Sequence, residues 1–386
     1  MFDQPEPPFL HLSEAPAAFA ATAAPDPGER MARLRLARSR RVGPVTYRRL
    51  MAEHGSAGAA LDALPDVARA AGDDGYEPYP ERAARAEGRA ARAAGARLLT
   101  LGDDDYPADL ADVADAPPVL WALGDLRILA APRVAVVGTR NASSLGLRMA
   151  RALGRDLAGA GVTVVSGLAR GVDARAHEAA LDAPSGATAA VHAGGLDKPY
   201  PAENAALAAR IAAEGLSLSE RAFGHAPTAR DFPRRNRIVS GLAQVVVVVE
   251  AAARSGSMIT ARDALDQGRE VAAVPGHPLD ARAGGCNLLL RDGATVVRGA
   301  EDVLELLDAL RAPPAEPAAP ADAAPTPDDH ADLAERLLAL LGAVPVDEDA
   351  LIADLGTPAP ATAAALSALE LDGRIRRRPG GGIVRA

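Results

Sequence analysis

The sequence holds little cysteine, few aromatic residues and no long apolar run. Among 386 residues there is one cysteine, and aromatic side chains make up 3%. A single cysteine excludes an internal disulfide framework and fits a reducing compartment. Scarce aromatic rings leave Ala, Val and Leu to build the cores. No apolar stretch approaches the roughly 18 residues that cross a bilayer, and the acidic start MFDQPEPP is unlike a signal peptide. We expect a cytoplasmic protein without a membrane partner.

The sequence also lacks the residue sets of common enzymes. Its seven histidines form no i, i+4 pair and the cysteine has no second thiol, so no zinc site is expected. Ser166 does not lie in a G-x-S-x-G elbow, and no Walker A lysine is present. Cys286, in a Gly-rich turn, is typical of a small buried thiol. We predict no catalytic residue, no metal and no cofactor, and hence a protein that is not an enzyme.

The charge is unevenly distributed along the chain. Its net charge of −9 argues against a nucleic-acid partner. Residues 133–299, however, hold 20 Lys and Arg against 15 Asp and Glu, a local excess of five positive charges. Most of these cations are arginines, whose planar guanidinium suits bidentate phosphate contacts. A basic centre between acidic flanks permits an anion site there, although genomic bias toward Ala and Arg accounts for the same composition.

The central part alternates short β-branched runs with amphipathic helical stretches. Continuous apolar strands separated by such helices indicate a doubly wound, mostly parallel α/β sheet covered on both faces. The seven runs are 133–138, 162–167, 187–195, 216–220, 244–250, 270–276 and 294–299. Several of them end in Gly or Ser, and ligands of such sheets gather at the carboxyl ends of the strands. The functional site is therefore expected at that edge.

The flanking regions have a different character. The predicted organisation is a flexible leader (1–28), a helical domain with a connector (29–120), the α/β domain (121–310), a Pro/Ala linker (311–329) and a winged-helix-like domain (330–386). The Gly43-Pro44 turn resembles a helix–hairpin–helix, or simply joins two packed helices. The basic segment RIRRRPGGG resembles a wing, but no Arg or Lys precedes it in the preceding helix. Binding of a partner or a regulatory role therefore stands beside DNA binding for this tail.

The turn after the first central strand is suited to an anion. Gly138 permits a tight turn, and Ser143 or Ser144 can cap the following helix while its free amides point outward. Thr139 lies in the same turn and Arg140 adds a positive charge. The turn is not a dinucleotide fingerprint, because G-x-G-x-x-G is absent and no acidic residue ends the second strand.

Two further turns are expected to face the first. Ser166, Gly167 and Arg170 follow the second strand in a Gly-rich turn, which is an anion site or only a structural turn. In the third turn, a cation at Lys198 lies close to Tyr200, which stands between two prolines. An aromatic ring beside a cation suits a stacked base with its phosphate nearby, and packing of the loop on its own domain explains it as well.

Basic and hydroxyl residues also open two later helices. Three arginines flank Asn236 within residues 234–237, where they oppose the helix dipole. A carboxylate such as Asp231 or Glu220, or a ligand phosphate, is therefore expected beside them. Residues 255–257 form another nest of amides and hydroxyls. We expect all these turns and arginines to converge on one cradle for a sugar–phosphate chain.

Six ordered phrases within residues 133–298 resemble the DNA-processing protein A (DprA/Smf) family. The phrases are GTRNAS, SGLARGVDARAH, GGLDKPYPAEN, FPRRNRIVSGL, SGSMITARDALDQGREVAAVPG and GCNLLLRDGA. The resemblance implies an extended Rossmann-like domain, preceded by a helical domain of SAM or helix–hairpin–helix type. It further implies a homodimer that binds single-stranded DNA, protects incoming strands in natural transformation and helps to load RecA.

The resemblance carries over to individual positions. The family's G-S/T-R motif falls on residues 138–140, and its basic pocket takes in Lys198 and the arginines near Asn236, with Tyr200 as a stacking neighbour. The predicted phosphate- and DNA-binding residues are Gly138, Thr139, Arg140, Ser166, Gly167, Arg170, Lys198, Tyr200, Asn204, Arg234, Arg235, Asn236, Arg237, Ser255, Gly256 and Ser257.

Two other functions fit the same architecture. A nucleotide phosphoribohydrolase similar to the LOG family would need a P-G-G-x-G-T-x-x-E motif. Here the comparable helix start reads RSGSMITARDA, with Ala264 after Asp263 and without the P-G-G sequence. The other alternative is a regulator that senses a small nucleotide and binds duplex DNA with its C-terminal domain.

Overall fold

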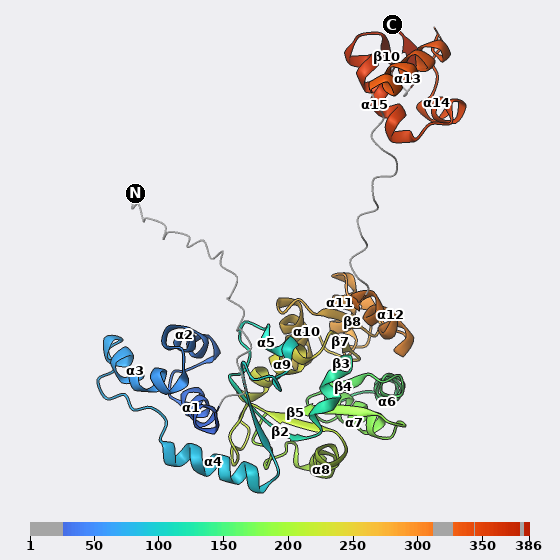
Figure 1. The fold of residues 1–386 in the computed structure, drawn as a ribbon. Coiled ribbons are helices and arrows are strands. Elements are labelled where there is room, and N and C mark those ends of the chain that lie inside the picture. Colours follow the sequence, from blue (N-terminus) through green and yellow to red (C-terminus); the bar gives the residue numbers. More distant parts are fainter. Residues whose placement is uncertain (1–25, 312–326, 343, 379–381) are drawn as a thin grey trace, which may run out of the picture. The chain divides into compact units, whose positions relative to one another are not determined.

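The computed structural model describes residues 26–311, 327–342, 344–378 and 382–386. The chain divides after Arg311 into two compact units, which are described separately (Figure 1). Most of the predicted leader and linker, residues 1–25 and 312–326, lies outside the described residues. No helix of the described residues is both long and apolar enough to cross a membrane.

The first unit contains a nine-stranded sheet in the order β1-β2-β6-β5-β4-β3-β7-β8-β9. The strands are β1 (Arg97–Thr100), β2 (Val119–Gly124), β3 (Arg133–Val137), β4 (Thr163–Ser166), β5 (Ala187–Val191), β6 (Leu216–Ser219), β7 (Val245–Val248), β8 (Glu270–Ala273) and β9 (Thr295–Val296). Strands β3 to β9 pair in parallel. The seven predicted strands and the parallel sheet are thus confirmed.

Strands β1 and β2 were not predicted. They form an antiparallel pair and add to β6, also antiparallel, so the stretch expected to be a connector extends the sheet. The segments RLLT and VLWALG are short and lie beside Pro-containing turns. Strand β6, to which this pair is added, comes about a hundred residues later in the chain. No local signal therefore identifies β1 and β2 as strands of this sheet.

Helices cover both faces of this sheet. They are α5 (Ala108–Ala111), α6 (Ser144–Gly159), α7 (Val172–Leu181), α8 (Ala205–Glu214), α9 (Asp231–Leu242), α10 (Gly256–Asp266), α11 (Gly284–Arg291) and α12 (Ala300–Arg311). Because successive strand side chains point to opposite faces, Val246 packs in the core beneath α9 and α10, whereas Val247 packs in the core beneath α6 and α12.

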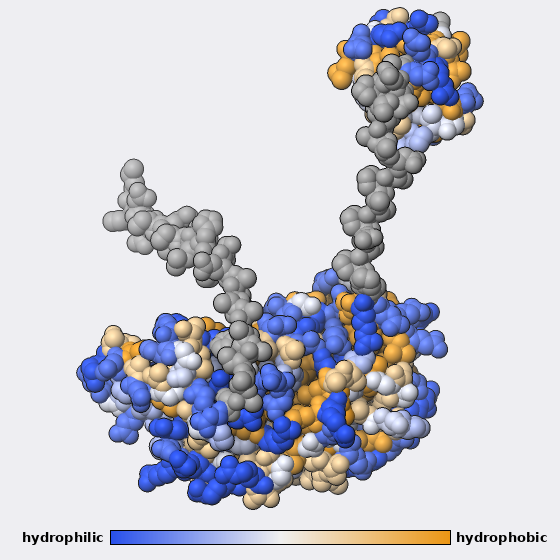
Figure 2. Space-filling view, viewed as in Figure 1, coloured by the Kyte–Doolittle hydropathy of each residue, from blue (hydrophilic) through white to orange (hydrophobic). Residues whose placement is uncertain are grey.

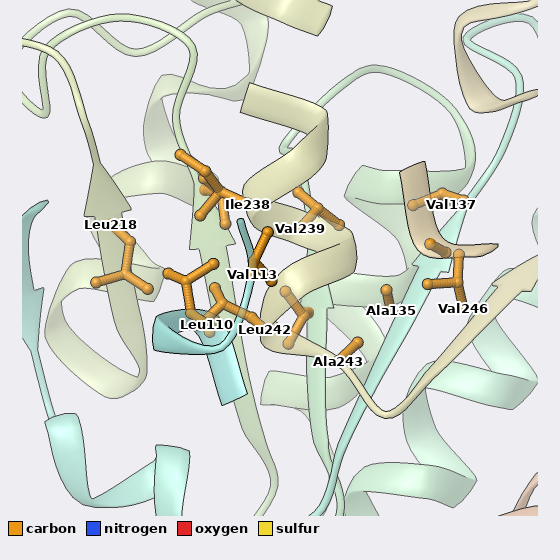
Figure 3. Close-up of a cluster of buried hydrophobic side chains, with 14 of the residues drawn as sticks. Leu110, Val113, Ala135, Val137, Leu218, Ile238, Val239, Leu242, Ala243 and Val246 are labelled. Carbon is orange, nitrogen blue, oxygen red and sulfur yellow. The ribbon is translucent and has the colours of Figure 1, made fainter. Parts of the chain in front are cut away.

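Helix α9 lies directly over the sheet and fixes one side of the future site. Ile238, Val239 and Leu242 project from one side of the helix into a buried apolar cluster with Leu110 and Val113 (Figure 3). These three side chains are at most 2% exposed. The i, i+1, i+4 spacing places them on one helix face, so the polar N-terminal turn of α9 is held at a fixed position.

The N-terminal helices α1 (Pro27–Arg38), α2 (Pro44–His54), α3 (Ala57–Ala70) and α4 (Glu81–Ala93) belong to the same unit. The Gly43-Pro44 turn provides the N-cap and the first residue of α2, a position where proline costs no hydrogen bond. The buried Glu87 carboxylate ties α4 to α1 and β2, because it accepts hydrogen bonds from Arg38 (2.8 Å) and from the Trp121 indole (2.7 Å).

The second unit has the predicted winged-helix fold. Its elements are α13 (Pro327–Leu340), α14 (Glu348–Leu355), α15 (Ala359–Leu371), β10 (Ile375–Arg377) and β11 (Ile383–Arg385). Leu351, Leu366 and Ile383 are part of its apolar core, and β10 pairs antiparallel with β11. Helix α15 contains no Lys or Arg. The predicted tip of the wing, residues 379–381, lies outside the described residues.

Candidate nucleic-acid interface

A cleft of about 390 Å³ lies where the strand order reverses. From β3 the chain builds β4, β5 and β6 on one side of the sheet, and later β7, β8 and β9 on the other. Ligands of open α/β sheets bind outside the carboxyl ends of the strands at such a point. The loops after β3 and β4 and the first turns of α9 and α10 line the cleft, so a cleft lies at the edge where the site was predicted.

The N-terminus of α6 is not the free anion site that the sequence suggested. Ser143 caps the helix as predicted, because its hydroxyl accepts a hydrogen bond from the Gly146 amide (3.0 Å). The Glu250 carboxylate, however, accepts the Ser143 amide proton (2.9 Å) and also the Ser143 hydroxyl proton. A Cβ at Gly146 would lie 2.4 Å from the Glu250 carboxyl carbon. The protein's own carboxylate thus fills the place expected for a phosphate.

Helix α10 has an open N-terminus at the same cleft. Ser255 is the N-cap, yet its side chain makes no capping hydrogen bond, and its buried hydroxyl has no partner among the described residues. The first amides of a helix lack intrahelical acceptors and lie at the positive end of its dipole. Ser255, Gly256 and Ser257 all line the cleft, and Asn236 reaches the Gly256 carbonyl (3.4 Å). The N-terminus of α10 is therefore the candidate phosphate site at this cleft.

Two aromatic rings and an arginine form one rim of the cleft. The Arg140 guanidinium lies 5.0 Å from the centre of the Phe232 ring, which meets Tyr200 edge-on at 5.3 Å. Tyr200 is 49% exposed. A second hollow of about 280 Å³ adjoins the cleft here and is also lined by Arg170 and Pro201. An exposed ring beside an exposed guanidinium offers a stacking surface and a phosphate contact together.

Phe232 was missed by the sequence analysis. It is one of only five phenylalanines and stands directly before Pro233 and the basic run that was singled out. The scarcity of aromatic residues in this chain is the signal that would have identified it.

Arg235 lines the floor of the cleft and of the adjoining hollow, where it is buried. Its buried guanidinium donates to the carbonyls of Gly167 and Val191 (2.7 Å for the latter). Burial lowers the pKa of Arg235 to about 10, and Arg140 adds to this while Asp173 opposes it. Asp173, whose pKa burial raises, accepts the Gly167 amide proton (3.1 Å). Arg235 thus remains charged at neutral pH and holds the second Gly-rich turn in place.

Three predicted site residues serve the fold instead. Arg237 is only 12% exposed and pairs with Glu220 (2.8 Å), one of the two carboxylates that the sequence suggested. The Ser166 hydroxyl is buried and donates to the Val136 carbonyl (2.7 Å). The Asn204 amide donates to the Leu168 carbonyl (2.9 Å). The expectation that these side chains face a ligand is therefore corrected.

The remaining predicted cations are exposed at different distances from the cleft. Arg170 lies 3.6 Å from Glu203 at the adjoining hollow. Lys198 lies on the same loop as Tyr200, and Arg234 lies in the first turn of α9, but neither lines the cleft or the hollow. The other carboxylate considered, Asp231, pairs with Arg221 (2.6 Å). The predicted cradle is thus reduced to Arg140, with Arg170 beside it and Arg235 buried in the floor.

Comparisons with known proteins decide the family. A family model described as DNA recombination-mediator protein A matches residues 97–308, which is more than half of the chain. The chain belongs to this family. Two further models, a DprA-like N-terminal HHH domain and a DprA winged helix domain, match residues 27–90 and 312–381. The DNA recombination-mediator protein A model covers the whole rim described above.

Individual relatives agree with this assignment. Protein Smf of Escherichia coli strain K12 is 41% identical over 285 residues, which are 74% of this chain and 76% of the relative. The X-ray structure of DNA processing protein A from Streptococcus pneumoniae is 42% identical, with a TM-score of 0.52, and the match covers 54% of this chain and 73% of that chain. The corresponding protein from Helicobacter pylori is 32% identical, with a TM-score of 0.51, over 55% of this chain and 96% of that one.

Membership of the DNA recombination-mediator protein A family confirms the resemblance seen in the sequence. It also accounts for the helical region before the sheet and the winged helix after it. The thiol of Cys286 is buried, and burial raises its pKa to about 11, as a structural cysteine requires. Within the described ranges, no group of three or more His, Cys, Asp or Glu side chains is placed to hold a metal ion.

Proposed function

We propose that this protein binds single-stranded DNA in the cleft at the β3–β7 switch point. The observation that carries the proposal is the Arg140 guanidinium over Phe232, opposite the open N-terminus of α10. Unpaired amides and a guanidinium suit a phosphate, and Tyr200 offers a base an exposed ring. Support also comes from the H. pylori relative, which is described by a single-stranded DNA binding mode.

In the proposed complex each group has a separate task. A backbone phosphate lies between Arg140 and the first amides of α10, with the Ser255 hydroxyl as an additional donor. A base stacks on Tyr200, whose ring is braced by Phe232. The buried charge of Arg235 attracts the phosphate without touching it, since charges interact more strongly in a poorly solvated interior. The binding of single-stranded DNA should therefore not depend on the identity of the base, because every base has a face that can stack on an aromatic ring.

The wider role is proposed on family grounds. We propose that the protein is not an enzyme, acts in the cytoplasm, protects incoming single strands in natural transformation and helps to load RecA onto them as a homodimer. The hydrolase alternative finds no favouring observation, because the carboxylate that lines the cleft, Asp173, is engaged with the Gly167 amide.

The decisive experiment is a titration of oligo-dT with the wild type and Arg140→Ala. Loss of the charge-assisted contact should weaken binding by about 1–3 kcal/mol, without a change in the melting temperature. Wild-type affinity should also fall steeply with salt, because phosphate binding releases counterions. Arg151→Ala, at an exposed position on α6 outside the cleft, is the matched control. Equal affinities of wild type and folded Arg140→Ala would refute the proposal.

A further inference from the structure

Helices α1 and α4 enclose a groove of about 540 Å³ in the N-terminal helical region. Four arginines converge on it, namely Arg35 of α1 and Arg85, Arg89 and Arg92 of α4. Glu81 is the only carboxylate among the described residues of its lining. Hydrophilic side chains cover this part of the surface in the view that shows α4 at the lower edge of the unit (Figure 2). The groove is therefore strongly basic in a chain whose net charge is −9.

The exposed face of α4 consists almost entirely of arginine and alanine. Glu81 pairs with Arg85 (2.5 Å). Glu87 is buried, and its carboxylate accepts hydrogen bonds from Arg38 and Trp121. Arg89 and Arg92 have no carboxylate partner among the described residues. Like charges three or four residues apart destabilise a helix. Arg92 in the last turn complements the helix dipole, but Arg89 and Arg92 still repel each other three residues apart.

A glycine in the middle of α4 shapes the groove. A Cβ at Gly88 would lie 3.3 Å from the Met31 methyl group of α1 and 3.8 Å from a terminal nitrogen of Arg92. The missing side chain thus lets the Met31 side chain of α1 pack close to α4, whereas a Cβ would be in ordinary contact with Arg92. Glycine is unfavourable at such a position in a helix, so the close approach of Met31 is a specific feature.

The neighbouring hairpin shows the contrast. Arg40 and Arg41, beside the Gly43-Pro44 turn that the sequence singled out, both lie near the Asp73 carboxylate (2.9 and 3.4 Å). Their charge is partly neutralised within the protein. Arg89 and Arg92, near the C-terminal end of α4, have no carboxylate partner among the described residues. The groove therefore attracts an anion more strongly than the hairpin does.

We infer that this groove binds the sugar–phosphate backbone of duplex DNA. Arg85 to Arg92 span two helical turns, about 10 Å, a length over which duplex DNA carries about six phosphates. Guanidiniums fit phosphate oxygens bidentately. Among the described residues, the groove lining contains no aromatic side chain, in contrast to Tyr200 and Phe232 at the sheet edge, and so these residues offer no stacking surface to an unstacked base. The inference goes beyond the proposed function, since it requires neither the cleft nor a single strand.

The test is a titration of blunt duplex DNA with the full chain and its triple variant Arg85→Gln, Arg89→Gln and Arg92→Gln. Glutamine retains helix propensity and removes the charge. We expect duplex affinity to fall at least about tenfold, and the slope of log affinity against log salt to lose about two to three units. The control is a triple Gln variant at Arg151, Arg155 and Arg291, which changes the net charge equally at exposed positions elsewhere.

Oligo-dT distinguishes this groove from the cleft. The α4 variant should retain oligo-dT affinity, whereas Arg140→Ala should lose it and retain duplex affinity. Unchanged duplex binding by the α4 variant, an equal loss in the control, or an equal loss on oligo-dT would each overturn the inference. Melting curves establish that the variants are folded, and the double variant Arg89→Gln with Arg92→Gln, which leaves the Glu81 pair intact, replaces the triple variant should it unfold.

Discussion

Helices α6 and α10 begin at the same edge of the sheet, on opposite faces, and their N-termini differ. Each follows one of two adjacent parallel strands, β3 and β7, and each has a serine N-cap. Ser143 of α6 is engaged by its own helix and by Glu250, whereas the Ser255 hydroxyl of α10 has no partner among the described residues. The same sequence signal therefore yields a closed structural cap in one case and an open anion site in the other.

The Glu250 carboxylate accounts for the difference between the N-termini of α6 and α10. Glu250 lies two residues after the end of β7 and its carboxylate binds Ser143 at the start of α6 rather than the helix that follows it in the chain, α10. An anion at a helix N-terminus stabilises the helix whether it belongs to the protein or to a ligand. In this chain the N-terminus of α6 is thus satisfied internally, while that of α10 is the one that we propose for the ligand.

The largest effect on stability is expected from substitution of Glu250, the residue that distinguishes the two helix N-termini. Glu250→Ala removes the acceptor of two Ser143 protons, and hydrogen bonds to a charged group contribute about 1.5–3 kcal/mol each at most. We expect the free energy of unfolding, measured by urea denaturation, to fall by about 2–3 kcal/mol. Glu250→Gln keeps one acceptor oxygen and should lose about half as much. Equal stability of Glu250→Ala and the wild type would show that α6 does not depend on this carboxylate.

The α6 case also shows which parts of the structure were predictable from sequence. The seven parallel strands were predicted because a buried strand is a local apolar run. The edge that holds the site followed from the Gly and Ser residues at strand ends. The contact of Glu250 with Ser143 joins residues 107 positions apart, and the pairing of Arg237 with Glu220 depends likewise on tertiary structure. No local pattern encodes the first contact, whereas Glu220 was one of the two carboxylates expected beside the arginines of 234–237, because those arginines oppose the helix dipole.

The run at residues 234–237 illustrates the same limit within one helical turn. Successive residues of a helix point about 100° apart, so equal residue types in a row reach different surroundings. Arg234 is exposed, Arg235 is buried in the floor of the cleft, and Arg237 belongs to an internal ion pair. Composition predicted a basic helix start, but only the position of α9 on the sheet decides which arginine serves which purpose.

A matched pair of serine variants sharpens the comparison. Ser143→Ala removes a capping hydroxyl and should lower the free energy of unfolding by about 1 kcal/mol, with oligo-dT affinity unchanged. Ser255→Ala removes a hydroxyl that makes no internal hydrogen bond, so stability should stay within about 0.5 kcal/mol. Its oligo-dT affinity should fall by about 1 kcal/mol, the size of one hydrogen bond. The measurements are urea denaturation and fluorescence anisotropy on both proteins.

The serine pair can also contradict the assignment. A loss of stability in Ser255→Ala equal to that in Ser143→Ala would mean that the α10 hydroxyl is a structural cap. A loss of oligo-dT affinity in Ser143→Ala alone would move the phosphate site back to α6.

The smallest predicted effect concerns the other end of α10. Burial, together with Asp115 and Asp266, raises the pKa of Asp263 to about 6. A carboxyl whose pKa is higher in the folded state than in the unfolded state, where it is about 3.9, favours folding when protonated. Its contribution is therefore fully present below about pH 4 and is lost as the pH rises through about 6. Asp263→Asn should remove this dependence.

At pH 7 the Asp263→Asn variant should be more stable than the wild type by about 1 kcal/mol, a value reduced because the side chain is only half-buried and solvent screens it. At pH 4 the two proteins should have equal free energies of unfolding. A negative charge near the C-terminus of α10 also opposes the helix dipole, which adds to the gain at pH 7. If the stability curves of the wild type and Asp263→Asn stay parallel from pH 4 to 7, Asp263 has the same pKa in the folded and the unfolded chain. The difference between α10 and α6 would then be confined to their N-termini.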